Sequence, residues 1–375
     1  MWSSFDRQMM MRALQLAAKG IYTTRPNPNV GCVIAKAGKI VGEGYHLKAG
    51  EPHAEVHALK QAKQQAKGAT AYVTLEPCSH FGRTPPCAQA LIDAGIARVV
   101  IAATDPNPLV GGEGIQMLRV AGIQVDTDLY STLSRNINLG FMKRMETKLP
   151  RVTVKVATSL DGKTALSNGE SKWITGSSAR QDVQRQRLLH CAVVTGINTV
   201  LADDCSLNVR MSQLGQLQYE LKEELLLQPL RVVLDSQCRM PISAKLLQIE
   251  SPVLLVSTTA YPEAFLAQLP EHVETLVLPA KGKQIDLNIL LQHLGQSCNS
   301  IMVEAGATLA GRFIAQNLAD ELLLYQAKKI LGSNGRNMLQ LPDFQQMSQI
   351  PTLELIDERK VGEDTRFRFR LTSTE

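Results

Sequence analysis

Short apolar segments alternate with helical segments along most of this chain, and this alternation is what most restricts its fold. In the first part of the chain, strands are expected at residues 30–35, 40–44, 71–75, 97–103 and 123–126. Apolar residues recur at helical spacing over residues 53–67, 87–94 and 114–120, and in a first helix capped by Ser3 or Ser4. Strands that alternate with helices predict an α/β fold with a mostly parallel sheet covered on both faces.

The alternation stops over residues 141–150, a charged segment that ends in Pro150, and resumes at residue 151. A chain of 375 residues is too long for one small core, so we expect two domains, residues 1–148 and 149–375. In the second domain, strands are expected at residues 151–157, 192–195, 231–234, 253–256 and 300–303, with a helix over residues 178–190. Residues 212–228 are rich in Gln, Glu and Leu and predict a surface insertion.

The charge distribution and the cysteine content indicate the kind of ligand and the cellular compartment of this chain. Residues 1–148 contain 17 Lys+Arg and 11 Asp+Glu, a net charge of +6, whereas residues 149–375 contain 23 and 24, a net charge of −1. The excess fits a solvated surface or the attraction of an anionic ligand. Seven cysteines in a chain that shows no export signal favour the reducing cytoplasm. No apolar run approaches the roughly 18 residues of a membrane span, so no membrane partner is expected.

Two motifs in the first part offer metal ligands. They are His53-Ala54-Glu55 and the segment 77–87, which contributes Cys78 and Cys87. One imidazole and two thiols leave one position of a tetrahedral zinc open, as in catalytic zinc sites. Water at such a position loses its proton near neutral pH, and Glu55, which is not a ligand, can then shuttle protons. This is the arrangement of the zinc nucleobase deaminases.

Two other interpretations share the same metal-binding residues. A purely structural zinc needs a fourth strong ligand, which His80 or Cys32 could supply, and the chain would then be a zinc-stapled binding module. A nucleic-acid base deaminase fits the basic first domain, but aromatic residues make up only 5% of the chain and are not interleaved with basic runs. That function also leaves the second domain without a role, so no nucleic-acid partner is expected.

Segments 26–31, 46–57 and 74–87 resemble the deaminase half of the bifunctional riboflavin-biosynthesis deaminase/reductase family. The resemblance implies a three-layer, cytidine-deaminase-like domain in which His53, Cys78 and Cys87 hold Zn²⁺ and Glu55 is the catalytic proton shuttle. Asparagine and aspartate suit the ring edge of an aminopyrimidine, and an arginine suits a phosphate. The substrate-binding residues that the resemblance implies are Asn27, His46, Arg83, Asp105 and Asn107.

Segments 154–162, 173–176, 180–187, 195–204 and 303–311 resemble the reductase half of the same family, whose fold is like dihydrofolate reductase. The chain lacks a full Gly-x-Gly-x-x-Gly here, but the turn at Gly306 precedes a helix whose first amides can hold a cofactor phosphate. The resemblance implies NADPH binding by Ala157, Trp173, Thr199, Asp203, Ser236 and Gly306. It implies substrate binding by Ser171, Arg187, Leu207, Arg210 and Glu304, with Lys155 as a further donor to the substrate.

The expected protein is therefore a multifunctional enzyme of riboflavin biosynthesis, both a hydrolase and an oxidoreductase. By resemblance, the first domain hydrolytically deaminates 2,5-diamino-6-(5-phosphoribosylamino)pyrimidin-4(3H)-one. The second then uses NADPH to reduce the ribosyl group of 5-amino-6-(5-phosphoribosylamino)uracil to ribityl. The partner is a small phosphorylated aminopyrimidine, and a homo-oligomer is expected because domain pairs with a short linkage often self-associate.

The chain departs from the family pattern at a few positions in the second half. His190-Cys191 stand where the family usually has Asp-Ala, Cys205 stands in place of Pro, and Ala305 in place of Gly. A residue with a Cβ makes the turn after Glu304 stiffer than glycine would. We expect these departures to alter local geometry and not the reaction.

Overall fold

The computed structural model describes residues 2–79, 85–107 and 111–372 of the chain. The chain divides into two compact units, Met1–Lys148 and Leu149–Glu375. Within the described residues, no helix combines the length and the apolar character of a membrane span.

The first unit is built on a five-stranded sheet. Its strands are β1 (Gly31–Lys36), β2 (Lys39–Tyr45), β3 (Thr70–Leu75), β4 (Arg98–Ala103) and β5 (Gln124–Asp126). The sheet order is β2-β1-β3-β4-β5, with β1 antiparallel to β2 and β3, and with β3, β4 and β5 parallel. The carboxyl ends of β3 and β4 therefore meet at one edge, which is where ligands gather in sheets of this kind.

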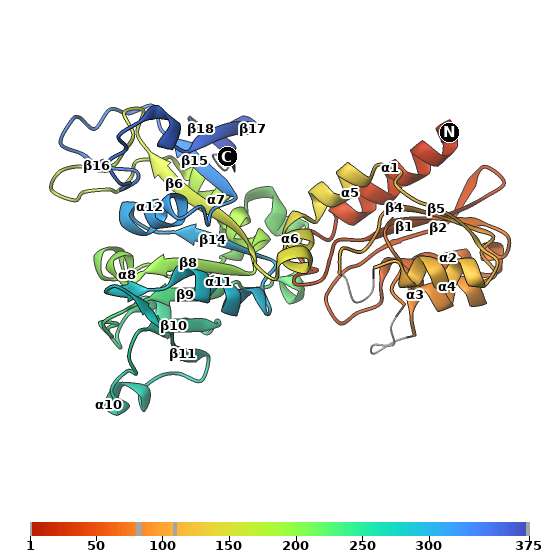
Figure 1. Ribbon diagram of the computed structural model, residues 1–375, viewed down its shortest axis with the longest axis horizontal. Coiled ribbons are helices and arrows are strands. Elements are labelled where there is room, and N and C mark those ends of the chain that lie inside the picture. Colours follow the sequence, from red (N-terminus) through yellow and green to blue (C-terminus); the bar gives the residue numbers. More distant parts are fainter. Residues whose placement is uncertain (1, 80–84, 108–110, 373–375) are drawn as a thin grey trace. The chain divides into compact units, whose positions relative to one another are not determined.

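Helices cover both faces of this sheet and make three layers. They are α1 (Ser4–Ala18), α2 (Ala54–Ala62), α3 (Cys87–Asp93), α4 (Glu113–Val120), α5 (Ser131–Ile137) and α6 (Leu139–Thr147). Helices α2, α3 and α4 lie on one face, and α1 and α5 on the other (Figure 1). The three-layer prediction is confirmed, whereas α5 and α6 were not expected from the sequence.

Two local features explain where the first helices begin and end. Ser3 caps α1: its Oγ accepts a hydrogen bond from Asp6 N at 3.0 Å, and Asp6 Oδ2 accepts one from Ser3 N at 3.1 Å. The helix predicted over residues 53–67 is shorter, because α2 ends at Ala62 and a 3₁₀ turn, Lys63–Ala66, follows. Lys63 has φ +49°, a conformation that does not continue an α-helix.

The second unit is built on a nine-stranded sheet. Its strands are β6 (Arg151–Thr158), β8 (Ala192–Gly196), β9 (Leu230–Leu234), β10 (Val253–Ser257), β11 (Val273–Val277), β14 (Ser300–Glu304), β15 (Glu321–Gln326), β17 (Thr352–Val361) and β18 (Asp364–Thr372). The order is β11-β10-β9-β8-β14-β6-β15-β18-β17. The strands from β11 to β15 in this order are parallel, and β18 and β17 are antiparallel additions at one side. Two small ribbons pair β7 (Lys163–Ala165) with β16 (Arg336–Asn337), and β12 (Ala280–Lys281) with β13 (Gln284–Ile285).

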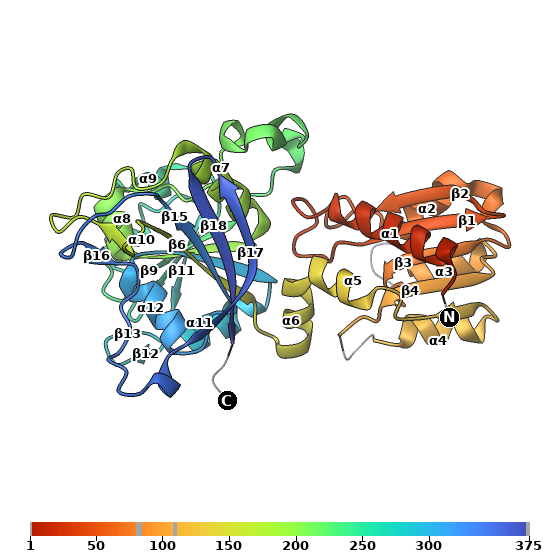
Figure 2. The ribbon, with the colours of Figure 1, turned by 90° about the horizontal axis from the view of Figure 1, so that it is seen from above.

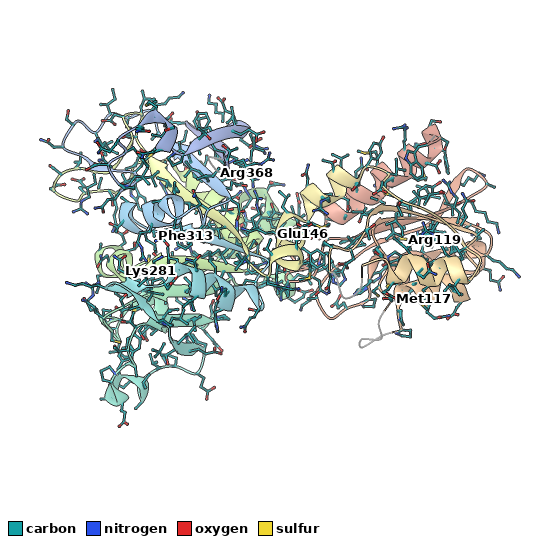
Figure 3. All side chains as sticks on the ribbon, in the orientation of Figure 1. Met117, Arg119, Glu146, Lys281, Phe313 and Arg368 are labelled. Carbon is teal, nitrogen blue, oxygen red and sulfur yellow. The ribbon has the colours of Figure 1, made fainter. Side chains whose placement is uncertain are left out.

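Helices also cover this sheet on both faces. They are α7 (Ser177–Leu189), α8 (Ile197–Asp203), α9 (Lys245–Gln248), α10 (Glu263–Leu266), α11 (Leu287–Gly295) and α12 (Ala307–Ala315). Helices α11 and α12 cover one face and α8 and α9 the other (Figure 2). Phe313 of α12 is completely buried against the sheet, whereas Arg119 of α4 is exposed on the first unit (Figure 3). The α/β class predicted for the second unit is confirmed.

Short 3₁₀ helices complete the second unit. They are Met211–Gln213, Gly215–Tyr219, Glu223–Leu225 and Met347–Gln349. Two of them lie in the insertion predicted at residues 212–228 and a third begins one residue before it, and most side chains of the insertion are exposed or half-buried. The last residue of the insertion, Gln228, has a half-buried side chain.

Candidate active sites

Three soft or borderline metal donors converge in the first unit. His53 is the N-cap residue of α2, Cys87 is the first residue of α3, and Cys78 follows the end of β3. Their ligand atoms all lie within 4.8 Å of one another. His53 Nδ1 is 3.7 Å from Cys78 Sγ and 3.3 Å from Cys87 Sγ. One nitrogen and two sulfurs at this separation are a donor set that suits tetrahedral zinc and leaves one position for a further ligand.

The carboxyl group of Glu55 lies buried beside these donors. Glu55 is the second residue of α2 and is only 3% exposed. Its Oε2 has no hydrogen-bond partner among the described residues. Burial raises the pKa of Glu55 to about 7, although the neighbouring His53 opposes the shift. A buried carboxyl with a free oxygen and this pKa can take up and release a proton near neutral pH.

Asn27 and His46 form a hydrogen-bonded pair next to His53. His46 Nδ1 is 3.2 Å from Pro52 O, and its Nε2 is 3.1 Å from Asn27 Nδ2. Because a carbonyl oxygen only accepts, Nδ1 carries the proton and Nε2 accepts from the Asn27 amide. Burial lowers the pKa of His46, which favours this neutral form. The His46 ring meets the His53 ring edge to face at 5.1 Å between centroids, so the pair lies against the metal donors.

In the second unit, most residues expected to bind the cofactor lie where neighbouring parallel strands end. Ala157 lies near the end of β6, Ser236 follows β9, and Gly306 follows β14 as the N-cap residue of α12. Thr199 and Asp203 lie on α8, directly after β8. Since β9, β8, β14 and β6 are adjacent in this order, these positions share one edge of the sheet.

Two expected residues of the second unit come from a different segment. Ser171 and Trp173 lie between β7 and α7. Trp173 is 64% exposed, and the Arg180 guanidinium lies 4.3 Å from the centre of its indole ring. The Trp173 indole ring is therefore largely exposed to solvent, shortly before α7 begins.

A half-buried carboxylate with two cations lies on the same sheet edge. Glu304, at the end of β14, receives two hydrogen bonds from Arg187 of α7, at 2.9 and 3.0 Å. Lys155 Nζ of β6 is 3.6 Å from Glu304 Oε1. Burial alone raises the pKa of Glu304, but Arg187 and Lys155 outweigh it and lower the pKa to about 2. Glu304 is therefore a carboxylate at any neutral pH and accepts hydrogen bonds only.

A second arginine adds positive charge to this group. Burial and the charge of Arg187 both lower the pKa of Arg210. Two guanidinium groups close enough to influence each other favour a bound anion between them. This fits the expectation that Arg187 and Arg210 meet a phosphorylated substrate.

Comparisons with known proteins match both parts of the chain. Residues 3–103 match the family model of the cytidine and deoxycytidylate deaminase zinc-binding region, and residues 150–367 match that of the RibD C-terminal domain. The riboflavin biosynthesis protein RibD of Haemophilus influenzae is 49% identical over 370 residues, 98% of each chain. That of Escherichia coli is 49% identical over 361 residues, 96% of this chain and 97% of the relative. The chain belongs to the RibD family.

Solved structures agree with this assignment. Form 1 of Acinetobacter baumannii RibD has a TM-score of 0.91 and 46% identity over 98% of this chain and 99% of that one. A Thermotoga maritima structure, described as a diaminohydroxyphosphoribosylaminopyrimidine deaminase/5-amino-6-(5-phosphoribosylamino)uracil reductase, has a TM-score of 0.85, with 31% identity and the same coverage. Like the RibD proteins, this chain is a bifunctional deaminase and reductase of riboflavin biosynthesis with a zinc-binding deaminase domain.

Glu76 was not predicted from the sequence, although it holds the loop that contains Asp105 and Asn107, two residues expected to bind the substrate. Glu76 is buried, and its Oε2 accepts hydrogen bonds from Asp105 N at 3.1 Å and Gly112 N at 3.0 Å. Its Oε1 accepts one from Ile115 N at 3.1 Å. Asp105 Oδ1 in turn accepts from Asn107 N at 2.8 Å. The only sequence signal was an acidic residue directly before the Pro77-Cys78 pair. Arg83 and His80 lie outside the described residues.

Asn138 is a second residue that sequence reasoning missed. Its side chain accepts a hydrogen bond from Asn29 N at 2.7 Å and donates one to Asn29 O at 2.9 Å. Asn138 lies between α5 and α6, two helices that were not expected, and it fixes the loop that carries Asn27. No pattern in the sequence pairs residues 109 positions apart.

The departures from the RibD pattern are accommodated locally. His190 is buried at the end of α7, with Nδ1 2.7 Å from Gln186 O and Nε2 3.2 Å from Thr153 Oγ1. Burial and the charge of Glu304 raise the pKa of Cys205 to about 12, so its thiol stays protonated. The ion pair between Arg187 and Glu304 forms in the presence of these substitutions.

Proposed function

We propose that the first unit hydrolyses the amino group at C2 of 2,5-diamino-6-(5-phosphoribosylamino)pyrimidin-4(3H)-one. We further propose that the second unit reduces the ribosyl group of the resulting 5-amino-6-(5-phosphoribosylamino)uracil to ribityl with NADPH. The observation that carries the first proposal is the cluster of His53, Cys78 and Cys87 beside the buried, unpartnered Oε2 of Glu55. The second proposal rests on Lys155, Arg187 and Glu304 at the edge where the parallel strands end.

In the deaminase, His53, Cys78 and Cys87 would hold zinc. The bound metal supplies a Lewis acid that lowers the pKa of water to near neutrality. Glu55 accepts a proton from the attacking water and delivers a proton to the amino group at C2. The C2–N bond then breaks, ammonia leaves and C2 becomes a carbonyl, while the second proton of the water passes to ring N1, which was doubly bonded to C2. Its burial beside the metal donors and the unpartnered Oε2 place Glu55 to make both transfers.

Recognition of the pyrimidine falls to neutral and acidic side chains around the metal donors. Asn27 is oriented by its hydrogen bond to His46, and Asp105 and Asn107 are held in one loop. Amide and carboxylate groups match the donors and acceptors on the ring edge. We assign the ribose phosphate to Arg83, because a guanidinium binds phosphate with two parallel hydrogen bonds.

In the reductase, the cofactor is assigned to Ala157, Trp173, Thr199, Asp203, Ser236 and Gly306. NADPH supplies a hydride to C1′ of the ribose in its open imine form. The amides at the start of α12, after Gly306, can bind a cofactor phosphate, and Trp173 offers a flat surface for stacking. The reduction also consumes one proton, for which Lys155 is the donor on this edge.

The substrate of the reductase is assigned to Ser171, Arg187, Leu207, Arg210 and Glu304. Arg187 and Arg210 supply the positive charge that a phosphate requires. Glu304, held as a carboxylate, accepts hydrogen bonds from hydroxyl or amino groups and fixes the orientation of Arg187.

One assay tests both reactions and their order. The zinc-loaded protein receives the diaminopyrimidine ribosyl phosphate and NADPH, and ammonia release and loss of NADPH absorbance are followed together. We expect ammonia first and NADPH oxidation second. Ammonia without NADPH oxidation would contradict the reductase assignment, and the absence of both would contradict the whole proposal.

The variant Glu55→Gln tests the proton shuttle. Glutamine has the same shape but cannot take up a proton, so deamination should fall at least about 10²-fold while bound zinc stays at the wild-type level. Reduction of supplied 5-amino-6-(5-phosphoribosylamino)uracil by the same sample should not change. Ammonia release near the wild-type rate would show that another group carries the proton.

A further inference from the structure

The segment of residues 206–210, which carries Leu207 and Arg210, belongs to no strand, yet three of its residues are buried and only Arg210 at its end is exposed. Ser206, Leu207 and Val209 are all less than 9% exposed. Leu207 has φ +55°, in the left-handed region that a leucine seldom adopts. A backbone conformation of this kind persists only where the surroundings fix it, and such positions cluster at functional sites.

Side chains from other elements provide this fixation by hydrogen-bonding the backbone of the segment. Gln228 clamps Val209 from both sides: its Oε1 accepts from Val209 N at 2.9 Å, and its Nε2 donates to Val209 O at 2.8 Å. Gln184 Oε1 accepts from Arg210 N at 3.0 Å. These bonds satisfy the backbone as a neighbouring strand would.

Two arginines donate hydrogen bonds to backbone carbonyl groups of the same segment. Arg187 Nη1 donates to Asn208 O at 3.1 Å, and Arg231 Nη1 donates to Ser206 O at 3.2 Å. Arg187 at the same time holds Glu304. The position of the segment is thereby linked to the carboxylate at the end of β14.

The two glutamines come from parts of the chain with no other function in the site. Gln184 is buried on α7, three residues before Arg187. Gln228 ends the insertion over residues 212–228, whose other side chains are exposed or half-buried apart from the buried Leu214. Through Gln228, the end of the insertion contacts the segment that carries Arg210. The insertion thereby has a role in the site that its composition did not suggest.

We propose that Gln228 and Gln184 are positioning residues of the reductase, which hold residues 206–210 so that Arg210 meets the substrate phosphate. The proposal rests on the assignment of Leu207 and Arg210 to the substrate. It predicts that the clamp serves the phosphorylated substrate specifically, and neither NADPH nor deamination.

The test replaces Gln228 by methionine, which keeps the length of the side chain but makes neither hydrogen bond. In Gln228→Met we expect KM for 5-amino-6-(5-phosphoribosylamino)uracil to rise about tenfold. KM for NADPH and ammonia release should stay at wild-type values, whereas the midpoint of thermal unfolding should fall by a few degrees, because the buried Val209 backbone loses both of its partners. KM for the dephosphorylated substrate should change by less than about twofold, because that substrate makes no use of Arg210.

Matched variants separate positioning from general damage. Gln216→Met alters an exposed glutamine of the same insertion and should leave all constants unchanged. Gln184→Met removes the second contact and should reproduce the selective rise in KM, and it decides the matter if Gln228→Met does not fold. An unchanged KM in a folded variant, or equal changes in KM for the phosphorylated substrate, the dephosphorylated substrate and NADPH, would overturn the proposal. Failure of the wild-type protein to reduce the phosphorylated substrate would instead overturn the proposed function.

Discussion

Glu76 is a single carboxylate that three backbone N–H groups share, and its replacement should disturb the deaminase selectively. In Glu76→Gln, one oxygen becomes an NH₂ group that faces N–H donors, and a buried donor without a partner costs about 1–3 kcal/mol. Since Asp105 depends on this carboxylate, we expect KM for the diaminopyrimidine to rise about tenfold with zinc retained. Steady-state ammonia release and metal analysis on the same sample measure both.

The exposed Glu113, in the first turn of α4, provides the control for this change of charge. Glu113→Gln should leave KM for the diaminopyrimidine as in the wild type. Loss of zinc from Glu76→Gln would contradict a role limited to the substrate loop, and so would an unchanged KM.

The residues proposed to hold the metal and transfer the proton could be found from the sequence, because their side-chain types are rare in combination. His53, Glu55, Cys78 and Cys87 form a recognisable set, and the structure brings their side chains together. Glu76 was not accessible, because its partners are backbone amides that leave no trace in the sequence. The same holds for the backbone contacts made by Asn138 and Gln228.

Most strands in the interiors of the two sheets were predicted, but the buried strand β15 and the exposed strand β17 were not. The strands of both sheet interiors are apolar, so β3, β4, β8 and β9 lie close to their expected positions. In contrast, β17 is exposed along most of its ten residues and contains charged and apolar residues without alternation. It is a strand because β18 pairs with it, a long-range contact that local composition does not express.

Helix α1 is fixed to the sheet by Asp6, which gives the first unit a predictable response to acid. Asp6 Oδ1 accepts hydrogen bonds from Tyr72 at 2.9 Å and Arg98 at 2.7 Å. Burial raises the pKa of Asp6, but the bonds from Ser3, Arg98 and Tyr72 outweigh it and lower the pKa to about 2. Because this pKa lies below the ordinary value of about 3.9, the ionised group stabilises the unit above about pH 4, and the stabilisation is lost as the pH falls through about 2.

The variant Asp6→Asn should therefore lose roughly 1–2 kcal/mol of unfolding free energy at neutral pH. It should also show a shallower loss of stability than the wild type between about pH 4 and pH 2. Calorimetric unfolding at a series of pH values measures both, with the exposed Asp93→Asn as the control. Parallel acid profiles for the wild type and Asp6→Asn would mean that the carboxylate does not contribute as its hydrogen bonds indicate.

At the scale of the whole molecule, the residues assigned to the two reactions separate completely between the two units. Those of the deaminase, from Asn27 to Asn107, lie in Met1–Lys148, and those of the reductase, from Lys155 to Gly306, lie in Leu149–Glu375. Each unit has its own sheet and its own buried core. Each activity can therefore serve as the internal control for a change made in the other unit.

Removal of the metal should divide the two activities along this boundary. A chelator that removes zinc from His53, Cys78 and Cys87 should abolish ammonia release, because the proposed hydrolysis needs the metal. All three metal donors lie in the first unit, and none lies in the second. Reduction of supplied 5-amino-6-(5-phosphoribosylamino)uracil should continue at the wild-type rate, since all the groups proposed to bind NADPH and this substrate lie in the second unit. NADPH oxidation that starts from the diaminopyrimidine should stop, and added zinc should restore it. Loss of both activities on chelation would instead mean that the metal also supports the reductase, and the two units would then have to be treated as energetically coupled.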